Sequence, residues 1–139
     1  MALFRFRPFR ALSHPVPVAV LSRRAARVTG PQTRPRPGRV AIEVRAGRDA
    51  TTVDIRGELD LVTAPVLDEQ LRLAVANKPA RLVLDMSGTD FMDCGCARLI
   101  AAARSALAAE ANLIIRQPSR GVRRVLELTG LDVYCEIQR

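Results

Sequence analysis

Asp93, Cys94 and Cys96 form the short segment of this chain whose side chains are best suited to chemistry. The segment follows an apolar run, Leu82 to Leu84, and precedes a helical pattern of apolar residues. Free backbone N–H groups and the positive end of the helix dipole meet at such a junction of strand and helix. That environment lowers the pKa of a thiol, so one hypothesis is that Cys94 and Cys96 are redox-active. The alternative is that both are small side chains packed in a tight turn, and a disulfide between them would close a strained ring.

The residue sets of the common enzyme classes are missing. The only histidine, His14, lies far from this segment, and there is no Gly-rich phosphate loop ending in Gly-Lys-Ser/Thr. Two thiols and one distant histidine are too few for structural zinc, which needs about four ligands. Asp85, Asp90 and Asp93 cluster near one loop and could chelate Mg²⁺ weakly, but turn formation and capping are the commoner roles. We therefore expect no enzyme activity, no metal and no cofactor.

Alternating apolar residues predict the elements that lead to this segment. A half-buried strand begins at Val40, and a second strand, with Val53 and Ile55 pointing inward, is expected to end at Gly57. The two strands are predicted to form a hairpin. Thr63 is the candidate N-cap of the first helix.

The second half of the chain alternates strands with helices. Residues 82–84 are typical of a strand covered on both faces. A helix is expected after a turn at residues 93–96, closed by Asn112, and a third helix capped by Ser119 precedes a last strand over residues 133–137. The order β-β-α-β-α-β-α-β predicts an α/β fold: a mixed central sheet with an N-terminal β-hairpin and helices packed on it.

Charge divides the chain into two parts. Residues 1–39 hold nine arginines, no acidic residue and most of the prolines, which predicts a disordered basic arm. Of the 22 basic residues, 13 remain in residues 40–139 beside 14 acidic residues, so this single domain carries about −1 although the chain carries +8. A nearly neutral domain argues against direct nucleic-acid binding by the fold.

The location of the protein is also suggested by composition. No apolar run approaches the about 20 residues of a membrane span. Three cysteines make an odd count without a secretory framework, which favours reduced thiols in a cytoplasmic protein. We expect a monomer.

Three sequence blocks follow one another at characteristic spacing: GELDLVTAP at residues 57–65, LDMSGTDFMD at residues 84–93, and VRRVLELTGL at residues 122–131. Together they resemble the STAS domain, and specifically the bacterial anti-sigma-factor antagonists. The resemblance covers about 100 residues and leaves out the N-terminal arm.

The resemblance implies a STAS-type fold and a partner-switching role. Family members bind an anti-sigma factor, usually a serine kinase of the GHKL type, and so release a sigma factor. The kinase phosphorylates a serine in an Asp-Ser-Ser-Gly motif after the central strand. Here Asp93-Cys94-Gly95-Cys96 stands at that motif, so Gly95 occupies the phosphoacceptor position and has no hydroxyl. Ser87 and Thr89 lie upstream in the same predicted loop, and neither matches the family position.

We therefore predict an anti-sigma-factor antagonist that acts by protein–protein interaction, without a phosphate switch at Gly95. Two alternatives stay open, a redox-responsive and a nucleotide-sensing STAS interaction module in a larger regulatory assembly. The predicted docking surface includes Asp60, Thr63, Ser87, Thr89, Asp93, Cys94, Gly95 and Cys96.

Overall fold

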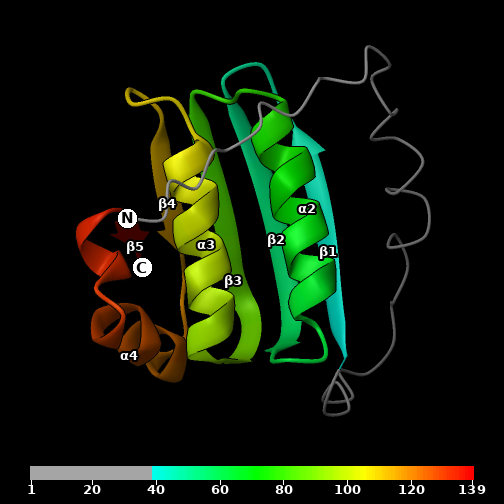
Figure 1. The fold of residues 1–139 in the computed structure, drawn as a ribbon, viewed down its shortest axis with the longest axis vertical. Coiled ribbons are helices and arrows are strands. Elements are labelled where there is room, and N and C mark those ends of the chain that lie inside the picture. The colour runs from blue at the N-terminus through cyan, green and yellow to red at the C-terminus, as the bar shows by residue number, and fades with distance from the viewer. Residues whose placement is uncertain (1–38) are drawn as a thin grey trace, which may run out of the picture.

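The computed structural model describes residues 39–139, which form a five-stranded sheet with helices packed on it (Figure 1). The predicted arm, except for Arg39, lies outside the described residues, so its disorder stays a prediction. The strands are β1 (Val40–Ala46), β2 (Ala50–Leu59), β3 (Arg81–Met92), β4 (Asn112–Arg116) and β5 (Glu136–Gln138). The helices are α2 (Ala64–Ala76), α3 (Cys94–Ala106), α4 (Arg120–Leu128) and the short 3₁₀ helix η1 (Leu131–Val133).

The sheet is mixed, and its strands lie in sequence order, β1-β2-β3-β4-β5. β1 and β2 form the predicted antiparallel hairpin, whereas each later strand runs parallel to the one before it. Parallel neighbours need a crossover connection, and α2, α3 and α4 lie in those connections. The predicted α/β fold with an N-terminal hairpin is therefore confirmed.

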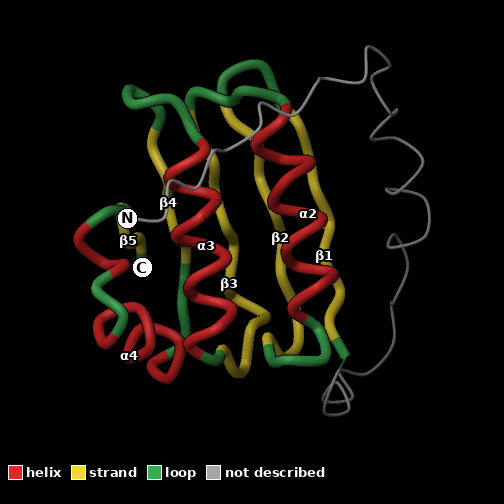
Figure 2. The backbone as a smooth tube through the Cα atoms, in the orientation of Figure 1, coloured by secondary structure: helices red, strands yellow, loops and turns green. Residues whose placement is uncertain are grey.

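One face of the sheet is covered by α2 and α3, which lie side by side and run along the strands (Figure 2). Leu67 and Leu71 of α2 and Ile100 and Ala103 of α3 are buried, as their helical spacing predicts. They pack with Leu84 of β3 into a single core cluster. None of the helices in residues 39–139 is long and apolar enough to span a membrane.

The opposite face of the sheet is polar. On that face Arg45 and Arg56 form ion pairs with Asp54 at 3.7 and 3.0 Å. Val83 is buried there but lies outside the core cluster, in which α2, α3 and α4 bury their apolar residues. Leu82, Val83 and Leu84 are all buried, so the prediction of a strand covered on both faces is confirmed at these residues.

Gly57 lies inside β2 and does not end it. Its φ is 107°, and a Cβ built there would lie 2.3 Å from the carbonyl oxygen of Arg39. Only glycine tolerates that backbone region and so close an approach. The register of β2 against β3 shifts between Gly57 and Glu58, and the strand then continues to Leu59. The glycine thus marks an irregularity within the strand, where we had predicted its end.

Two other predicted boundaries were wrong. α3 ends at Ala106, and Asn112 instead begins β4, where its N–H donates to the carbonyl of Ala80 at 3.0 Å. Val133 ends η1 and is exposed, so β5 contains only three residues. Both errors arise because strand boundaries depend on hydrogen-bond partners from other segments. Ser119 caps α4 as predicted, with its Oγ accepting from the N–H of Val122 at 3.3 Å.

Candidate partner-docking site

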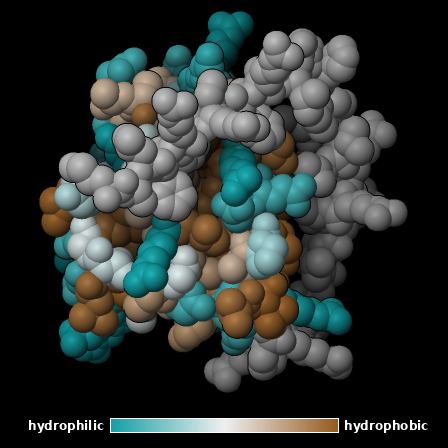
Figure 3. Space-filling view, in the orientation of Figure 1, coloured by the Kyte–Doolittle hydropathy of each residue, from teal (hydrophilic) through white to brown (hydrophobic). Residues whose placement is uncertain are grey.

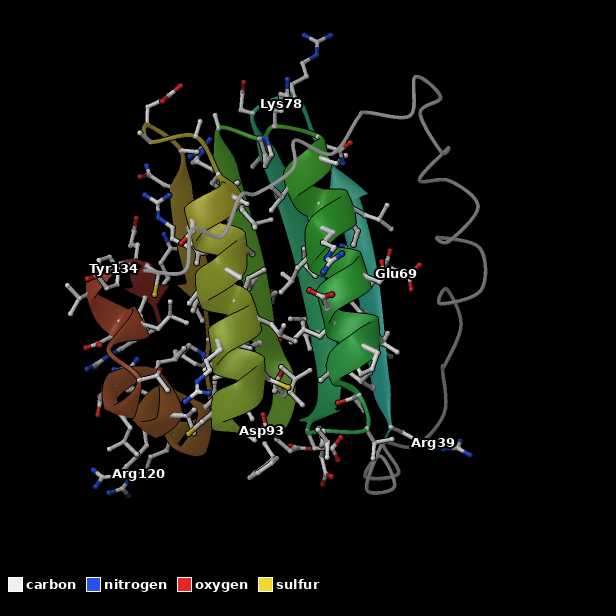
Figure 4. All side chains as sticks on the ribbon, in the orientation of Figure 1. Arg39, Glu69, Lys78, Asp93, Arg120 and Tyr134 are labelled. Atoms are coloured by element: carbon white, nitrogen blue, oxygen red, sulfur yellow. The ribbon has the colours of Figure 1, made fainter. Side chains whose placement is uncertain are left out.

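Two connections meet at the carboxyl end of β2 and β3. Residues 60–63 join β2 to α2, and Asp93 joins β3 to α3. The N–H of Asp93 donates to the carbonyl of Leu59 at 2.9 Å, and the Sγ of Cys96 donates to the carbonyl of Asp60 at 3.6 Å. These contacts bring the first two sequence blocks together at the end of the sheet where Figure 4 labels Asp93.

Asp93 is the N-cap of α3. Its backbone is extended, with φ −88° and ψ 170°, and its Oδ1 accepts from the N–H of Cys96 at 2.7 Å. An N-cap carboxylate satisfies a helix N–H and lies at the positive end of the helix dipole. Residues 94–96 are consequently the first turn of the helix, and the prediction of a separate turn before it was wrong.

Gly95 is exposed in this first turn. A Cβ built there would meet only the side chain of Asp93, with Oδ1 at 3.4 Å and Cγ at 4.0 Å. Both distances are ordinary van der Waals contacts, and the φ of Gly95 does not lie in the left-handed region. The backbone therefore does not require glycine here, and a serine would fit.

Thr63 occupies the N-cap position of α2, but its side chain does not cap the helix. The hydroxyl instead donates to the carbonyl of Glu58 at 2.8 Å and accepts from the N–H of Asp60 at 2.9 Å. Oδ1 of Asp60 in turn accepts from the N–H groups of Val62 and Thr63 at 2.9 and 3.0 Å. The predicted position was right and the predicted role was wrong, because these hydrogen bonds close the β2–α2 loop.

The same span of residues matches a known protein family. A family model described as "Mlab, STAS domain" matches residues 42–138, which is more than half of the chain. The chain belongs to the STAS domain family. This confirms the resemblance carried by the three sequence blocks.

Proteins similar to this STAS domain carry related names. It is 28% identical over 96 residues to the anti-sigma-F factor antagonist RsfB of Mycobacterium tuberculosis, covering 69% of this chain and 79% of RsfB. It is 29% identical over 102 residues to the anti-sigma-B factor antagonist of Listeria monocytogenes, covering 71% and 89%. The crystal structure of an anti-sigma factor antagonist from Mycobacterium paratuberculosis matches with a TM-score of 0.69 at 29% identity, covering 74% and 88%. All three names describe regulators, in agreement with the prediction that this STAS domain is not an enzyme.

The environment of Cys96 opposes the predicted thiolate. Its side chain is fully buried, and burial, a hydrogen bond to Asp93 and the negative charges of Asp93 and Asp60 raise the pKa of Cys96 to about 12. These effects outweigh the helix dipole, so the thiol stays neutral and donates to the Asp60 carbonyl. The prediction of a lowered pKa was therefore wrong for Cys96. Cys94 is exposed, and both cysteines are free thiols.

We expect alkylation of the native STAS domain to modify Cys94 long before Cys96, because only Cys94 is exposed. The pKa of Cys96 lies above the 9.0 of an ordinary thiol, so the stabilisation from its neutral form is complete below pH 9. As pH rises from about 9 toward 12, the unfolded chain loses this proton and the folded chain keeps it, so the free energy of unfolding falls.

Denaturation of the wild type and of Cys96→Ala at neutral and alkaline pH measures this dependence. The free energy of unfolding should fall less steeply with pH in the variant than in the wild type. Burial raises the pKa of Cys135 to about 11, and this residue contributes equally to the pH dependence of both proteins. Alkylation of Cys94 and Cys96 at equal rates in the native state, or equal slopes for the two proteins, would contradict the prediction.

Ser87 and Thr89 lie within β3, where we had predicted a loop. Thr89 is 2% exposed, and its Oγ1 donates to the carbonyl of Ile55 at 2.9 Å. This bond lies where the register of β3 against β2 shifts. Thr89 therefore joins two strands and offers no accessible hydroxyl, whereas Ser87 is exposed.

The eight predicted docking residues differ in exposure. The exposed ones are Ser87, Cys94 and Gly95, and the half-buried ones are Asp60 and Asp93. The buried ones are Thr63, Thr89 and Cys96. The buried side chains can support a docking surface by holding its loops, but they do not form that surface. Their common role in partner binding stays a prediction.

Sequence reasoning missed three exposed apolar side chains at this end of the sheet. Leu61 is 84% exposed, Val62 is 73% exposed and Phe91 is 50% exposed. A signal was available, because Leu61 and Val62 lie between the polar residues Asp60 and Thr63 in a connection and not in a strand.

The predicted carboxylate cluster does not form a metal site. Asp93 caps α3, and Oδ1 of Asp85 accepts from the N–H of Ser87 at 3.1 Å. Across residues 39–139, no group of three or more His, Cys, Asp or Glu side chains is arranged to hold a metal ion. The predicted capping role thus describes Asp93, whereas Asp85 lies within β3 and accepts from the N–H of Ser87.

Proposed function

We propose that this STAS domain is an anti-sigma factor antagonist that binds an anti-sigma factor at the junction of β3 and α3. The anti-sigma factor antagonists to which it is similar support the class of partner. The observation that carries the proposal is the exposed first turn of α3, capped by Asp93 and held against the β2–α2 loop. A specific interface buries about 800 Å² per partner and takes about 20–30 residues, so this junction would be its centre.

The rigidity of the junction suits a docking role. The loop and the helix are joined by the Asp93–Leu59 and Cys96–Asp60 hydrogen bonds, and the Thr63 hydroxyl closes the loop from inside. A surface held in place before binding loses less conformational entropy when the partner docks. Because the proposed partner controls a sigma factor, the complex would form in the cytoplasm.

Gly95 makes the proposed complex insensitive to phosphorylation at the family's phosphoacceptor position. A serine kinase of the GHKL type could dock here but would find no hydroxyl at residue 95. Thr89 is buried and hydrogen-bonded, so it does not substitute. We therefore propose an antagonist whose binding is not turned off at this position.

The Gly95→Ser variant tests the partner and the missing switch together. Anti-sigma factors of the host are titrated against the wild type and the variant by calorimetry, with and without ATP. We expect both proteins to bind, and ATP to weaken binding at least tenfold only for Gly95→Ser, since a phosphate adds about −1.5 to −2 charges. Mass spectrometry of residues 87–98 locates the phosphate.

Gly121→Ser is the matched control. Gly121 is also the second residue of a helix, is exposed, and has no atom within 4 Å of an added Cβ. Binding of the anti-sigma factor by Gly121→Ser should be the same with and without ATP, as for the wild type. Failure of the wild type to bind any host anti-sigma factor would contradict the proposed function, whereas ATP-sensitive binding by the wild type would contradict only the missing switch.

A further inference from the structure

An apolar surface lies exposed at the carboxyl end of the sheet. We define it as the carboxyl-end patch, formed by Leu61, Val62 and Phe91. Phe91 pairs in register with Glu58, which directly precedes Leu59 at the end of β2. The patch therefore lies where β2 and β3 end. Figure 3 shows apolar surface at the bottom of the molecule, below α2. Exposed apolar side chains gathered at one end of a fold are typical of interaction surfaces.

Carboxylates without ion pairs surround the carboxyl-end patch. None of the four is in an ion pair within residues 39–139: Glu58, Asp60, Asp90 and Asp93. The polar face of the sheet is different, because Arg45 and Arg56 neutralise Glu43 and Asp54 there. The patch therefore combines apolar side chains with carboxylates that have no ion-pair partner within residues 39–139.

The N-terminal segment joins the fold beside this patch. Val40 pairs with Gly57, and the carbonyl of Arg39 accepts from the N–H of Glu58 at 3.2 Å. Figure 4 labels Arg39 at the same end of the sheet as Asp93. Residues 1–38 are thus attached where the carboxylates and the apolar side chains lie.

The composition of residues 1–38 complements the patch. The segment contains eight arginines and no acidic residue, together with Phe4, Phe6 and Phe9, which are three of the four phenylalanines in the chain. Arginine pairs well with carboxylates, and phenylalanine buries large apolar area. Ten residues of linker span at least roughly 17 Å, so a segment of 38 residues is long enough to return to the sheet.

We propose that residues 1–38 bind in cis over the carboxyl-end patch. The arginines lie against the surrounding carboxylates, and the phenylalanines cover Leu61, Val62 and Phe91. Attachment through Arg39 gives the segment an effective concentration of the order of mM, so weak contacts suffice. The segment then competes with a partner that docks at the β3–α3 junction; this consequence alone rests on the proposed function.

Amide NMR spectra of the full chain test the contact without needing a partner. The wild type is compared with a full-chain variant in which the eight arginines of residues 1–38 are replaced by glutamine. We expect shift changes at Leu61, Val62 and Phe91 several-fold larger than at Gly47 and Lys78, which lie at the opposite end of the sheet. High salt should reproduce the changes in the wild type, because it screens exposed charges.

A second full-chain variant changes only the patch. In Leu61→Ser with Val62→Ser, the ring signals of Phe4, Phe6 and Phe9 should move toward those of a free peptide. Shift changes that are absent, or no larger than those at Gly47 and Lys78, would overturn the proposal. Concentration-dependent changes at the patch that persist in the arginine variant would also overturn it, because they would assign the patch to a second copy of the chain.

Discussion

Replacing Gly57 by alanine should lower the free energy of unfolding by at least about 2 kcal/mol. The φ of 107° disfavours any residue with a Cβ, and that atom would lie 2.3 Å from the Arg39 carbonyl oxygen. Relief requires β1 to move away from β2 at the point where Val40 pairs with Gly57. Urea denaturation followed by circular dichroism measures the loss.

Gly121→Ala is the control for this substitution. Gly121 lies in α4 with open space around an added Cβ, so alanine should stabilise the protein by about 0.5–1 kcal/mol through helix propensity. The two substitutions should therefore change the free energy of unfolding in opposite directions. Equal small effects would show that β2 tolerates a side chain at residue 57, contrary to the irregularity described in the strand.

Replacing Thr63 by valine should cost about 1–3 kcal/mol of stability. Valine keeps the shape of the side chain but leaves the Glu58 carbonyl without its donor and the Asp60 N–H without its acceptor. Thr63 is 3% exposed, so water does not readily replace these bonds. Amide hydrogen exchange should accelerate across residues 60–63, and denaturation should report the loss of stability.

Thr52→Val provides the comparison for Thr63→Val. Thr52 is a half-buried residue of β2, and its hydroxyl is not part of the hydrogen bonds that close the β2–α2 loop. Valine is a good strand residue, so this substitution should leave stability almost unchanged. If the two valine variants lost the same stability, the hydroxyl of Thr63 would not be what closes the β2–α2 loop.

Local pattern was sufficient for most of the elements in this protein. Alternation predicted the hairpin, helical spacing predicted the buried residues of α2 and α3, and Ser119 correctly marked the start of α4. These features depend on residues close together in the sequence. The boundaries at Asn112 and Val133 were wrong because they depend on strands that are distant in sequence.

At the candidate site, too, some features follow from local sequence and others depend on contacts with distant segments. That residue 95 has no hydroxyl, and that the segment after β3 begins a helix, follows from residue types and spacing alone. The exposure of Gly95 and the burial of Cys96 do not, although the two residues are adjacent. The β2–α2 loop contacts Cys96 and leaves Gly95 open. Burial of the Cys96 thiol, together with the hydrogen bond and charge of Asp93, reverses its expected pKa.

The sequence by itself determined the order of strands and helices, the STAS family and the chemical groups available at the β3–α3 junction. Periodicity, capping and residue identity are local properties, and they are readable before folding. Only the tertiary structure decided that Thr63 and Thr89 are internal hydrogen-bond donors, that Leu61, Val62 and Phe91 are exposed, and that residue 57 must be glycine. Each of these depends on which distant backbone lies within a few ångströms, and that distance is set by the packing of the whole sheet.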